Sequence, residues 1–173
     1  MITLFQLKQI CPVVKTKVLE KWLEPLNAAM DEFEIDTPKR QAAFLAQVAH
    51  ESGGFHYTRE IASGEAYEGR KDLGNEEPGD GVRYKGRGLL QLTGRANYAA
   101  CSAALGLDLL GEPALLEEPE NAARSAAWFW HTRGLNALAD AQNFRKITLR
   151  INGGLNGYGD RERYYERAQD VLA

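Results

Sequence analysis

Apolar residues recur at intervals of three and four along the first third of the chain, which is the period of an α-helix with one buried face. This spacing predicts a helix over residues 15–33. A second helix is predicted to begin at Pro38, with Thr37 as its N-cap, and to end near Gly53. The N-terminal part of the chain, residues 1–36, is therefore expected to be helical and to lead directly into this second helix.

Helical periodicity is lost between residues 52 and 94 and then returns. Ten of the seventeen glycines fall in this stretch, among many charged residues, so we expect loops there with a short hairpin at most. The later helices are predicted over residues 95–105, 119–133, 143–151 and 161–172, with Asp160 as the N-cap of the last. No segment alternates well enough to form a central strand. The chain is therefore predicted to be mainly α, with an irregular glycine-rich central insert.

The composition is that of one ordinary globular domain. The chain has 173 residues, of which 44% are apolar and 26% charged, so residues 1–173 are expected to form a single domain with a real core. No apolar stretch is long enough to cross a bilayer, and no secretory signal peptide is visible at the N-terminus. The net charge of −3 argues against binding to nucleic acid or to an anionic membrane through charge.

The sequence lacks the motifs of several familiar site classes. His50-Glu51 is not followed by the second histidine of a zinc-protease motif, so no metal site and no cofactor are expected. Neither phosphate-binding glycine pattern fits the segment after Tyr84, and there is no G-x-S-x-G elbow. Cys11 and Cys101 have no metal-like spacing and are expected to be reduced and partly buried, with one disulfide as the alternative.

Glu51 is the first candidate for chemistry. It shares one helical face with Phe44 and Val48, so its carboxyl group lies beside the apolar stripe at the C-terminal turn of the second predicted helix. Desolvation and the negative end of the helix dipole both favour the protonated form, which a general acid requires. The two glycines that follow let backbone or a ligand approach the carboxyl closely. The alternative is a partly exposed glutamate at a frayed helix end.

A second carboxylate is required if Glu51 serves glycoside hydrolysis, because most glycosidases use a pair. Spacing alone does not choose among the acidic residues of the insert, which are Glu60, Glu65, Glu68, Asp72, Glu76, Glu77 and Asp80. The segment that follows, residues 84–98, places glycines around an arginine and then polar Gln91 and Thr93 within an apolar run. This pattern indicates a tightly packed backbone beneath a polar surface formed by Gln91 and Thr93. The alternative is an ordinary turn that leads into a helix.

Four blocks of sequence together resemble glycoside hydrolase family 19, which comprises chitinases and the chitinase-like endolysins of bacteriophages and prophages. The blocks are Phe44 to Gly54 (FLAQVAHESGG), Tyr84 to Tyr98 (YKGRGLLQLTGRANY), Ile151 to Gly154 (INGG) and Asp160-Arg161. The resemblance covers about residues 38–165, so residues 37–173 are expected to be the catalytic core. It implies an α-helical, lysozyme-like fold with two lobes and a cleft lined by the insert.

The resemblance also implies hydrolysis of a β-1,4 bond between N-acetylated amino sugars, with inversion at the anomeric carbon. Glu51 matches the general acid of the family. Compact bacterial members carry the general base nine residues later, which is Glu60 here. The insert differs from that of many bacterial chitinases, so Glu68 is the alternative base. The base must be an ionised carboxylate that activates water on the face opposite the leaving group.

Five further residues match family positions that hold the substrate or the attacking water. Gln91 and Thr93 match positions that help to hold water and substrate, and Asn97 and Asn152 match sugar-contacting amides. Arg161 matches an arginine that neighbours the acid. Amides and a hydroxyl suit a neutral sugar, which is bound through hydrogen bonds rather than through charge.

Peptidoglycan and chitin share the β-1,4-linked N-acetylglucosamine unit, so these blocks do not separate the two substrates. A small enzyme without an export signal or a wall-binding module resembles an endolysin, made in the host cytoplasm and released to the periplasmic wall. We therefore expect a monomeric peptidoglycan hydrolase for host lysis, with a chitin oligomer as the alternative substrate. Two other hypotheses remain, a non-catalytic saccharide-binding relative and a lytic transglycosylase.

Overall fold

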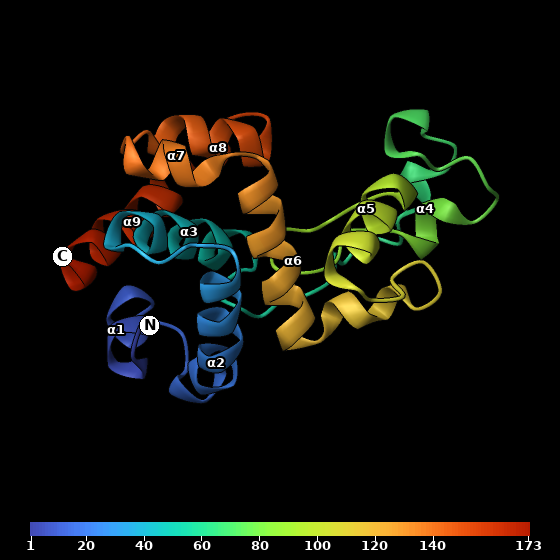
Figure 1. The fold of residues 1–173 in the computed structure, drawn as a ribbon. Coiled ribbons are helices and arrows are strands. Elements are labelled where there is room, and N and C mark those ends of the chain that lie inside the picture. The colour runs from blue at the N-terminus through green and yellow to red at the C-terminus, as the bar shows by residue number, and fades with distance from the viewer.

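The computed structural model describes residues 1–173 and contains helices but no β-sheet, which confirms the prediction of a mainly α chain (Figure 1). The α-helices are α1 (Leu4–Ile10), α2 (Thr16–Glu32), α3 (Pro38–Glu51), α4 (Asp80–Arg83), α5 (Arg95–Leu105), α6 (Pro119–Thr132), α7 (Leu135–Asp140), α8 (Phe144–Asn152) and α9 (Tyr158–Leu172). Three short 3₁₀ helices are η1 (Glu65–Tyr67), η2 (Lys71–Leu73) and η3 (Pro113–Glu117). None of these helices could span a membrane.

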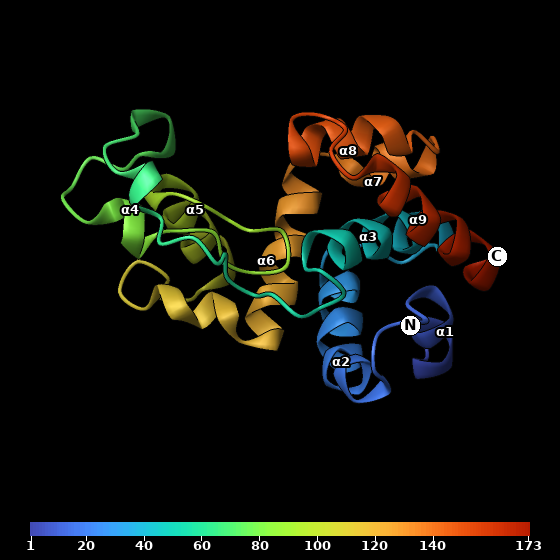
Figure 2. The same cartoon turned by 180° about the vertical axis from the view of Figure 1, so that it is seen from behind.

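The helices form two lobes, as the family resemblance implies. Figure 1 shows α1, α2, α3, α7, α8 and α9 on one side, α4 and α5 on the other, and α6 between them. Figure 2 shows the same division from behind, with two extended segments crossing between the lobes and both chain ends in the larger one. The crossing segments are the two sides of the glycine-rich insert. Their backbones meet where the Gly88 amide donates to the Thr58 carbonyl at 2.8 Å.

The larger lobe is built around α3, in which every residue from Gln41 to Ala49 is buried. Helix α9 packs along it, and α6 packs against α2. Aromatic rings join these layers: Phe44 lies edge-on to Trp130, with 5.4 Å between ring centroids, and Phe144 stacks on Tyr165 at 4.1 Å. A helix buried on all sides is rigid, so the side chains at the end of α3 are carried on a fixed support.

Most predicted helices are confirmed, and one correction concerns the start of the last helix. The Thr37 side chain accepts a hydrogen bond from the Arg40 amide, as an N-cap does, with Pro38 at the first helical position. Helix α9, however, begins at Tyr158 after Gly157 in a left-handed conformation, so the prediction that Asp160 is its N-cap is wrong. Asp160 lies in the first turn instead. Its Oδ2 is 2.7 Å from Nδ1 of His50.

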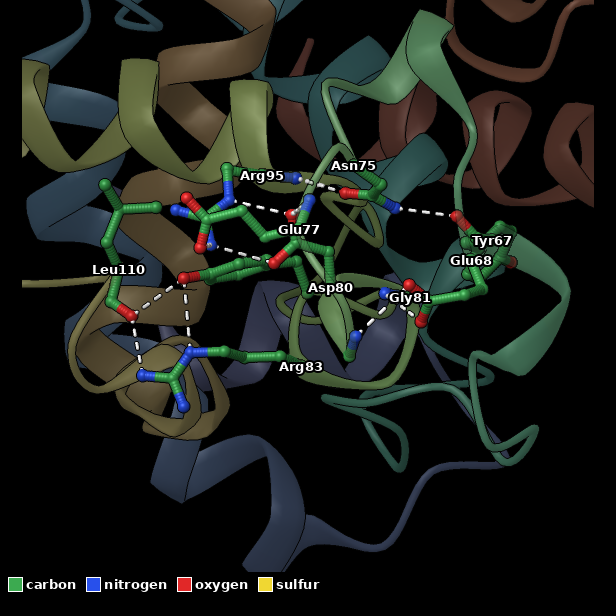
Figure 3. Close-up of polar contacts among 11 residues, drawn as sticks. Tyr67, Glu68, Asn75, Glu77, Asp80, Gly81, Arg83, Arg95 and Leu110 are labelled. Atoms are coloured by element: carbon green, nitrogen blue, oxygen red, sulfur yellow. Dashed lines mark hydrogen bonds and ion pairs between the residues drawn. The ribbon is translucent and has the colours of Figure 1, made fainter.

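The insert has no hairpin. It contains only isolated bridges, in which Arg87 pairs with Arg59 and with Leu92. Its far end is held by polar bonds to α5 (Figure 3): the buried Asp80 carboxylate accepts two hydrogen bonds of 2.8 Å from the guanidinium of Arg95. The Asn75 side chain accepts from the Arg95 amide at 2.9 Å. These side-chain bonds, rather than the backbone hydrogen bonds of a β-sheet, hold the insert in place in the smaller lobe.

The Asp80–Arg95 pair gives a test of this arrangement. Its hydrogen bonds with Arg95 hold the pKa of the Asp80 carboxyl below its usual range, so the pair stabilises the fold above about pH 4, and the contribution is lost as pH falls through the lowered pKa. We expect Asp80→Asn to lower the Tm at pH 7 by roughly 5–10 °C. The difference from wild type, followed by thermal melts from pH 7 to pH 3, should shrink below about pH 4. A difference independent of pH would contradict the pair's role.

The two cysteines lie in different apolar clusters. Cys11 belongs to the core of the larger lobe and Cys101 to the smaller cluster around Tyr84 and Tyr98. Both are free and buried, and burial raises the pKa of each thiol to about 12. The structure therefore agrees with the expectation of reduced, buried thiols.

Candidate active site

A hollow of about 160 Å³ lies between the two lobes. Helix α5 and the insert form one wall, α6 the floor, and the end of α8 the other wall. The residues that line it are Leu73, Leu90, Gln91, Leu92, Thr93, Asn97, Ser125, Ala126, Phe129 and Ile151. Three of the predicted polar contacts, Gln91, Thr93 and Asn97, are therefore brought together in one cavity.

The predicted acid, Glu51, is the last residue of α3, and its carboxylate meets a buried guanidinium. One Nη of Arg161 lies 2.6 Å from Oε1 of Glu51. The Arg161 side chain is only 1% exposed, whereas that of Glu51 is 21% exposed and keeps access to solvent. The structure thus places Arg161 beside Glu51, the residue that the family resemblance implies as the acid. It is the only charge partner of Glu51 among the ion pairs of the chain.

The predicted base, Glu60, lies on the segment that crosses from α3 to the smaller lobe. Its Oε1 accepts a hydrogen bond from the Gly86 amide at 2.7 Å, and its Oε2 accepts from the Tyr67 hydroxyl at 2.9 Å. Burial, and then the hydrogen bond to Glu60, raise the pKa of Tyr67, so this hydroxyl keeps its proton and donates it. Both carboxyl oxygens of Glu60 are acceptors, which is the arrangement that the ionised form requires.

Gly86 connects Glu60 with the polar side chains of the hollow. The position of a Cβ at Gly86 would be 2.9 Å from Oε1 of Gln91 and 3.3 Å from Oγ1 of Thr93. A side chain there would press on both groups, which explains why the tightly packed segment carries glycine at this point. Gly86 therefore lies between Glu60, which is bonded to its amide, and the side chains of Gln91 and Thr93, which lie more than thirty residues after Glu60 in sequence.

Local hydrogen bonds fix the polar side chains of the hollow. Gln91, in a left-handed conformation with φ 55°, donates from its amide to the Gly88 carbonyl at 3.0 Å. Thr93 donates to the Gln91 carbonyl at 3.0 Å, and Asn97 donates to the Thr93 carbonyl at 2.8 Å. These bonds use side-chain donors only, so the side-chain carbonyl oxygens of Gln91 and Asn97 remain for a ligand.

Asn152 lies at the end of α8, beside Ile151 of the hollow. Its side-chain nitrogen is buried and has no hydrogen-bond partner within the chain. An unsatisfied buried donor is costly, and a ligand acceptor would satisfy it. Asn152 is not itself among the residues that line the hollow, so its role as a sugar contact stays a prediction.

The alternative base, Glu68, occupies a different place. Its carboxylate accepts hydrogen bonds from the backbone amides of Gly79 and Gly81 at 3.1 and 3.4 Å (Figure 3). These bonds tie together two turns of the insert at the far end of the smaller lobe. Glu68 forms no ion pair, and its neighbour Arg70 pairs with Asp72 at 2.5 Å. No group of three or more His, Cys, Asp or Glu side chains is arranged to hold a metal ion.

Sequence reasoning missed three residues that hold the candidate site. Tyr67 lies in the irregular insert, and nothing in the sequence shows that its hydroxyl reaches Glu60. Gln47 and Thr148 are polar residues on buried helical faces, and they bond to each other at 2.9 Å behind Arg161. A buried polar residue at a helical core position is the signal that could have identified both of them.

Removal of the guanidinium tests its link to the acid. We expect Arg161→Met to move the alkaline limb of the pH–activity profile to higher pH, because the Glu51 carboxylate loses the cation that stabilises its charged form. The measurement is kcat against pH on a glycan oligomer, with circular dichroism to verify the fold. An unmoved alkaline limb in a folded variant would show that the two groups do not interact.

Comparison with known proteins identifies the family. A family model described as chitinase class I matches residues 27–143. A glycosyl hydrolase family 19 domain-containing protein of Haemophilus influenzae is 33% identical over 180 residues, covering 82% of this chain and 84% of that protein. An Arabidopsis thaliana endochitinase is 42% identical over 114 residues, covering 65% of this chain and 39% of that protein. The matched part is thus less than half of the plant enzyme.

Solved structures agree with the sequence comparison. Chitinase C from Streptomyces griseus superposes with a TM-score of 0.79 at 26% identity, covering 98% of this chain and 76% of that chain. A bacterial family 19 chitinase superposes with a TM-score of 0.80 at 26% identity, covering 99% of this chain and 94% of that chain. The two-lobed helical fold is therefore the fold of these enzymes. The chain belongs to glycoside hydrolase family 19.

Proposed function

We propose that the chain hydrolyses β-1,4 bonds between N-acetylated amino sugars by an inverting mechanism, with Glu51 as general acid and Glu60 as general base. The observation that carries this proposal is the different setting of the two carboxyl groups. Glu51 is backed by one buried cation at 2.6 Å and keeps one oxygen free, whereas both oxygens of Glu60 accept hydrogen bonds. Two carboxyl groups in unlike environments suit one acid and one base.

The proposed reaction is a single displacement across the space between the lobes. Glu51 gives its proton to the departing glycosidic oxygen, and Glu60 takes a proton from a water that attacks the anomeric carbon from the opposite face. Gln91 and Thr93, which share the Gly86 contact with Glu60, hold that water. Asn97 holds the sugar through its side-chain oxygen, because its side-chain nitrogen already donates to the Thr93 carbonyl, and Asn152 holds it through its unpaired side-chain nitrogen.

As the substrate we propose peptidoglycan, in the role of an endolysin that acts on the periplasmic wall after its release. Tyr57, Arg59, Glu60, Ile61 and Lys85 line a second hollow of about 410 Å³. Its two cations are weakly engaged: the Arg59 side chain is 66% exposed and lies 3.8 Å from Glu117, and Lys85 bonds only a backbone carbonyl. Peptidoglycan carries stem peptides with carboxylates, whereas chitin is neutral. Cations beside the base therefore suit peptidoglycan.

Chitin is the second candidate substrate, because several relatives of the chain are named endochitinases or chitinases. The test is a parallel assay of the purified protein on peptidoglycan and on chitin oligomers. We expect faster release from peptidoglycan, and products heavier than the lytic transglycosylase products by one water. The newly formed reducing end should have the inverted configuration by NMR. Activity confined to chitin, anhydro-sugar products, or binding without cleavage would each contradict the proposal.

A further inference from the structure

A chain of hydrogen bonds runs behind the candidate acid through the core of the larger lobe. Arg161, which pairs with Glu51, also donates from Nη1 to the side-chain oxygen of Gln47 at 2.6 Å. The side-chain nitrogen of Gln47 donates to the Thr148 hydroxyl at 2.9 Å, and that hydroxyl donates to the Phe144 carbonyl at 3.1 Å. Gln47 and Thr148 are both completely buried.

The direction of each bond is determined by the last one. A hydroxyl has one proton, and that of Thr148 is given to the Phe144 carbonyl. The hydroxyl is then an acceptor towards Gln47, whose amide must present its N–H to Thr148 and its oxygen to Arg161. An amide turned the other way would point its N–H at the guanidinium, and both groups would be donors. Thr148 therefore fixes the orientation of the Gln47 amide.

The same bond aligns two helices that carry candidate site residues. Gln47 and Glu51 are four residues apart on one face of α3, and Thr148 and Asn152 are four residues apart on one face of α8. The Gln47–Thr148 bond thus joins the two helices one turn before Glu51 on α3 and one turn before Asn152 on α8. It fixes the register of α3 against α8 where both helices reach the space between the lobes.

We propose that Gln47 and Thr148 are positioning residues for the hydrolysis, acting on Glu51 through Arg161. The inference rests on the proposed function, because it takes Glu51 as the acid. The Gln47 oxygen offsets part of the guanidinium charge at 2.6 Å and holds the group at the correct angle to the carboxylate. Without that oxygen, more of the positive charge acts on Glu51 and its ionised form is favoured.

The test uses Thr148→Val, which removes the hydroxyl at nearly constant volume, and Gln47→Met, which removes the amide. We expect the alkaline limb of kcat against pH to move to lower pH in both variants, opposite to the movement expected for Arg161→Met. The maximal kcat should fall about tenfold, because small displacements of a catalytic group are costly, while KM changes little. Thr148→Ser keeps a hydroxyl and should restore the wild-type profile.

A matched control separates positioning from stability. Asn136→Ala removes a hydrogen bond of 2.8 Å to Trp130 in the same lobe and should lower the Tm without moving the pH profile. If Thr148→Val behaves like this control, with an unchanged limb and kcat, the positioning role is refuted. If Thr148→Val does not fold, Gln47→Met is compared with the control instead, and an unchanged limb and kcat in Gln47→Met refute the positioning role. Failure of the proposed function is distinct, because the wild-type protein would then not cleave the glycan, or Glu51→Gln would keep the wild-type activity.

Discussion

Glu51→Gln should abolish hydrolysis and leave the fold intact. The amide has the shape of the carboxyl group, and its oxygen can still accept the hydrogen bond from Arg161, which lies 2.6 Å from the native carboxylate. It has no acidic proton to give to the departing glycosidic oxygen. We therefore expect a loss of at least ~10²-fold in kcat, the usual contribution of a general acid.

The measurement is the rate of glycan cleavage together with the Tm and the affinity for an uncleaved oligomer. The Tm should change little, because Glu51 is partly exposed and its partner keeps an acceptor. Affinity should also persist, since the polar residues of the hollow are untouched. Near wild-type turnover at unchanged Tm would refute Glu51 as the acid. Loss of binding along with turnover would instead assign Glu51 to substrate recognition.

The long helices could be predicted because their sequence signals are local. Thr37 and Pro38 mark the start of α3 within two residues, and apolar residues at steps of three and four trace α2 and α5. Helix α7 is not predicted, and α1 is predicted only as part of the helical region 1–36 without bounds of its own, because the two are only six and seven residues long. Helices of this length are unstable alone and depend on packing against the rest of the lobe. A segment of six or seven residues also contains too few apolar positions to show a helical period.

The start of α9 was misplaced for a related reason. Asp160 has the residue type of an N-cap, but Gly157 takes the left-handed conformation that begins the helix three residues earlier. A Cβ at Gly157 would lie within van der Waals overlap of the His50 imidazole, so contact with α3 demands glycine there. The helix start is therefore set by tertiary packing, which the local sequence does not contain.

Three of the residues that line the hollow could be predicted from the sequence, but the contacts of the candidate site could not. The family blocks brought out Gln91, Thr93 and Asn97, which the structure gathers in one hollow. The same blocks carry no information on Tyr67, which lies in the insert outside them and reaches Glu60 through the path of the loop. Nor do they show that Gly86 lies between Glu60, the proposed base, and the side chains of Gln91 and Thr93. Such contacts arise from the fold of the insert, whose sequence is irregular.

The second large loss of activity is expected when the proposed base, Glu60, is removed. Glu60 is bonded to the amide of Gly86, which lies next to the Gln91 and Thr93 side chains that are proposed to hold the water. Glu68 instead bonds two glycine amides at the far end of the smaller lobe. We expect Glu60→Ala to lose at least ~10²-fold in kcat, because no other carboxylate is positioned to activate the water. Glu68→Ala should lower the Tm and retain more than about a tenth of the activity, since it loses structure in the insert and not a reacting group.

Added azide sharpens this comparison. Removal of the Glu60 side chain leaves space next to the anomeric carbon, and a small anion there can attack without a base. Azide should therefore restore turnover to Glu60→Ala and give a glycosyl azide of inverted configuration, detectable by NMR and mass spectrometry. It should not accelerate Glu68→Ala or Glu51→Gln, because the first retains its base and the second still lacks its acid. A dead Glu68→Ala beside an active Glu60→Ala would reverse the assignment of the base while leaving the family membership intact.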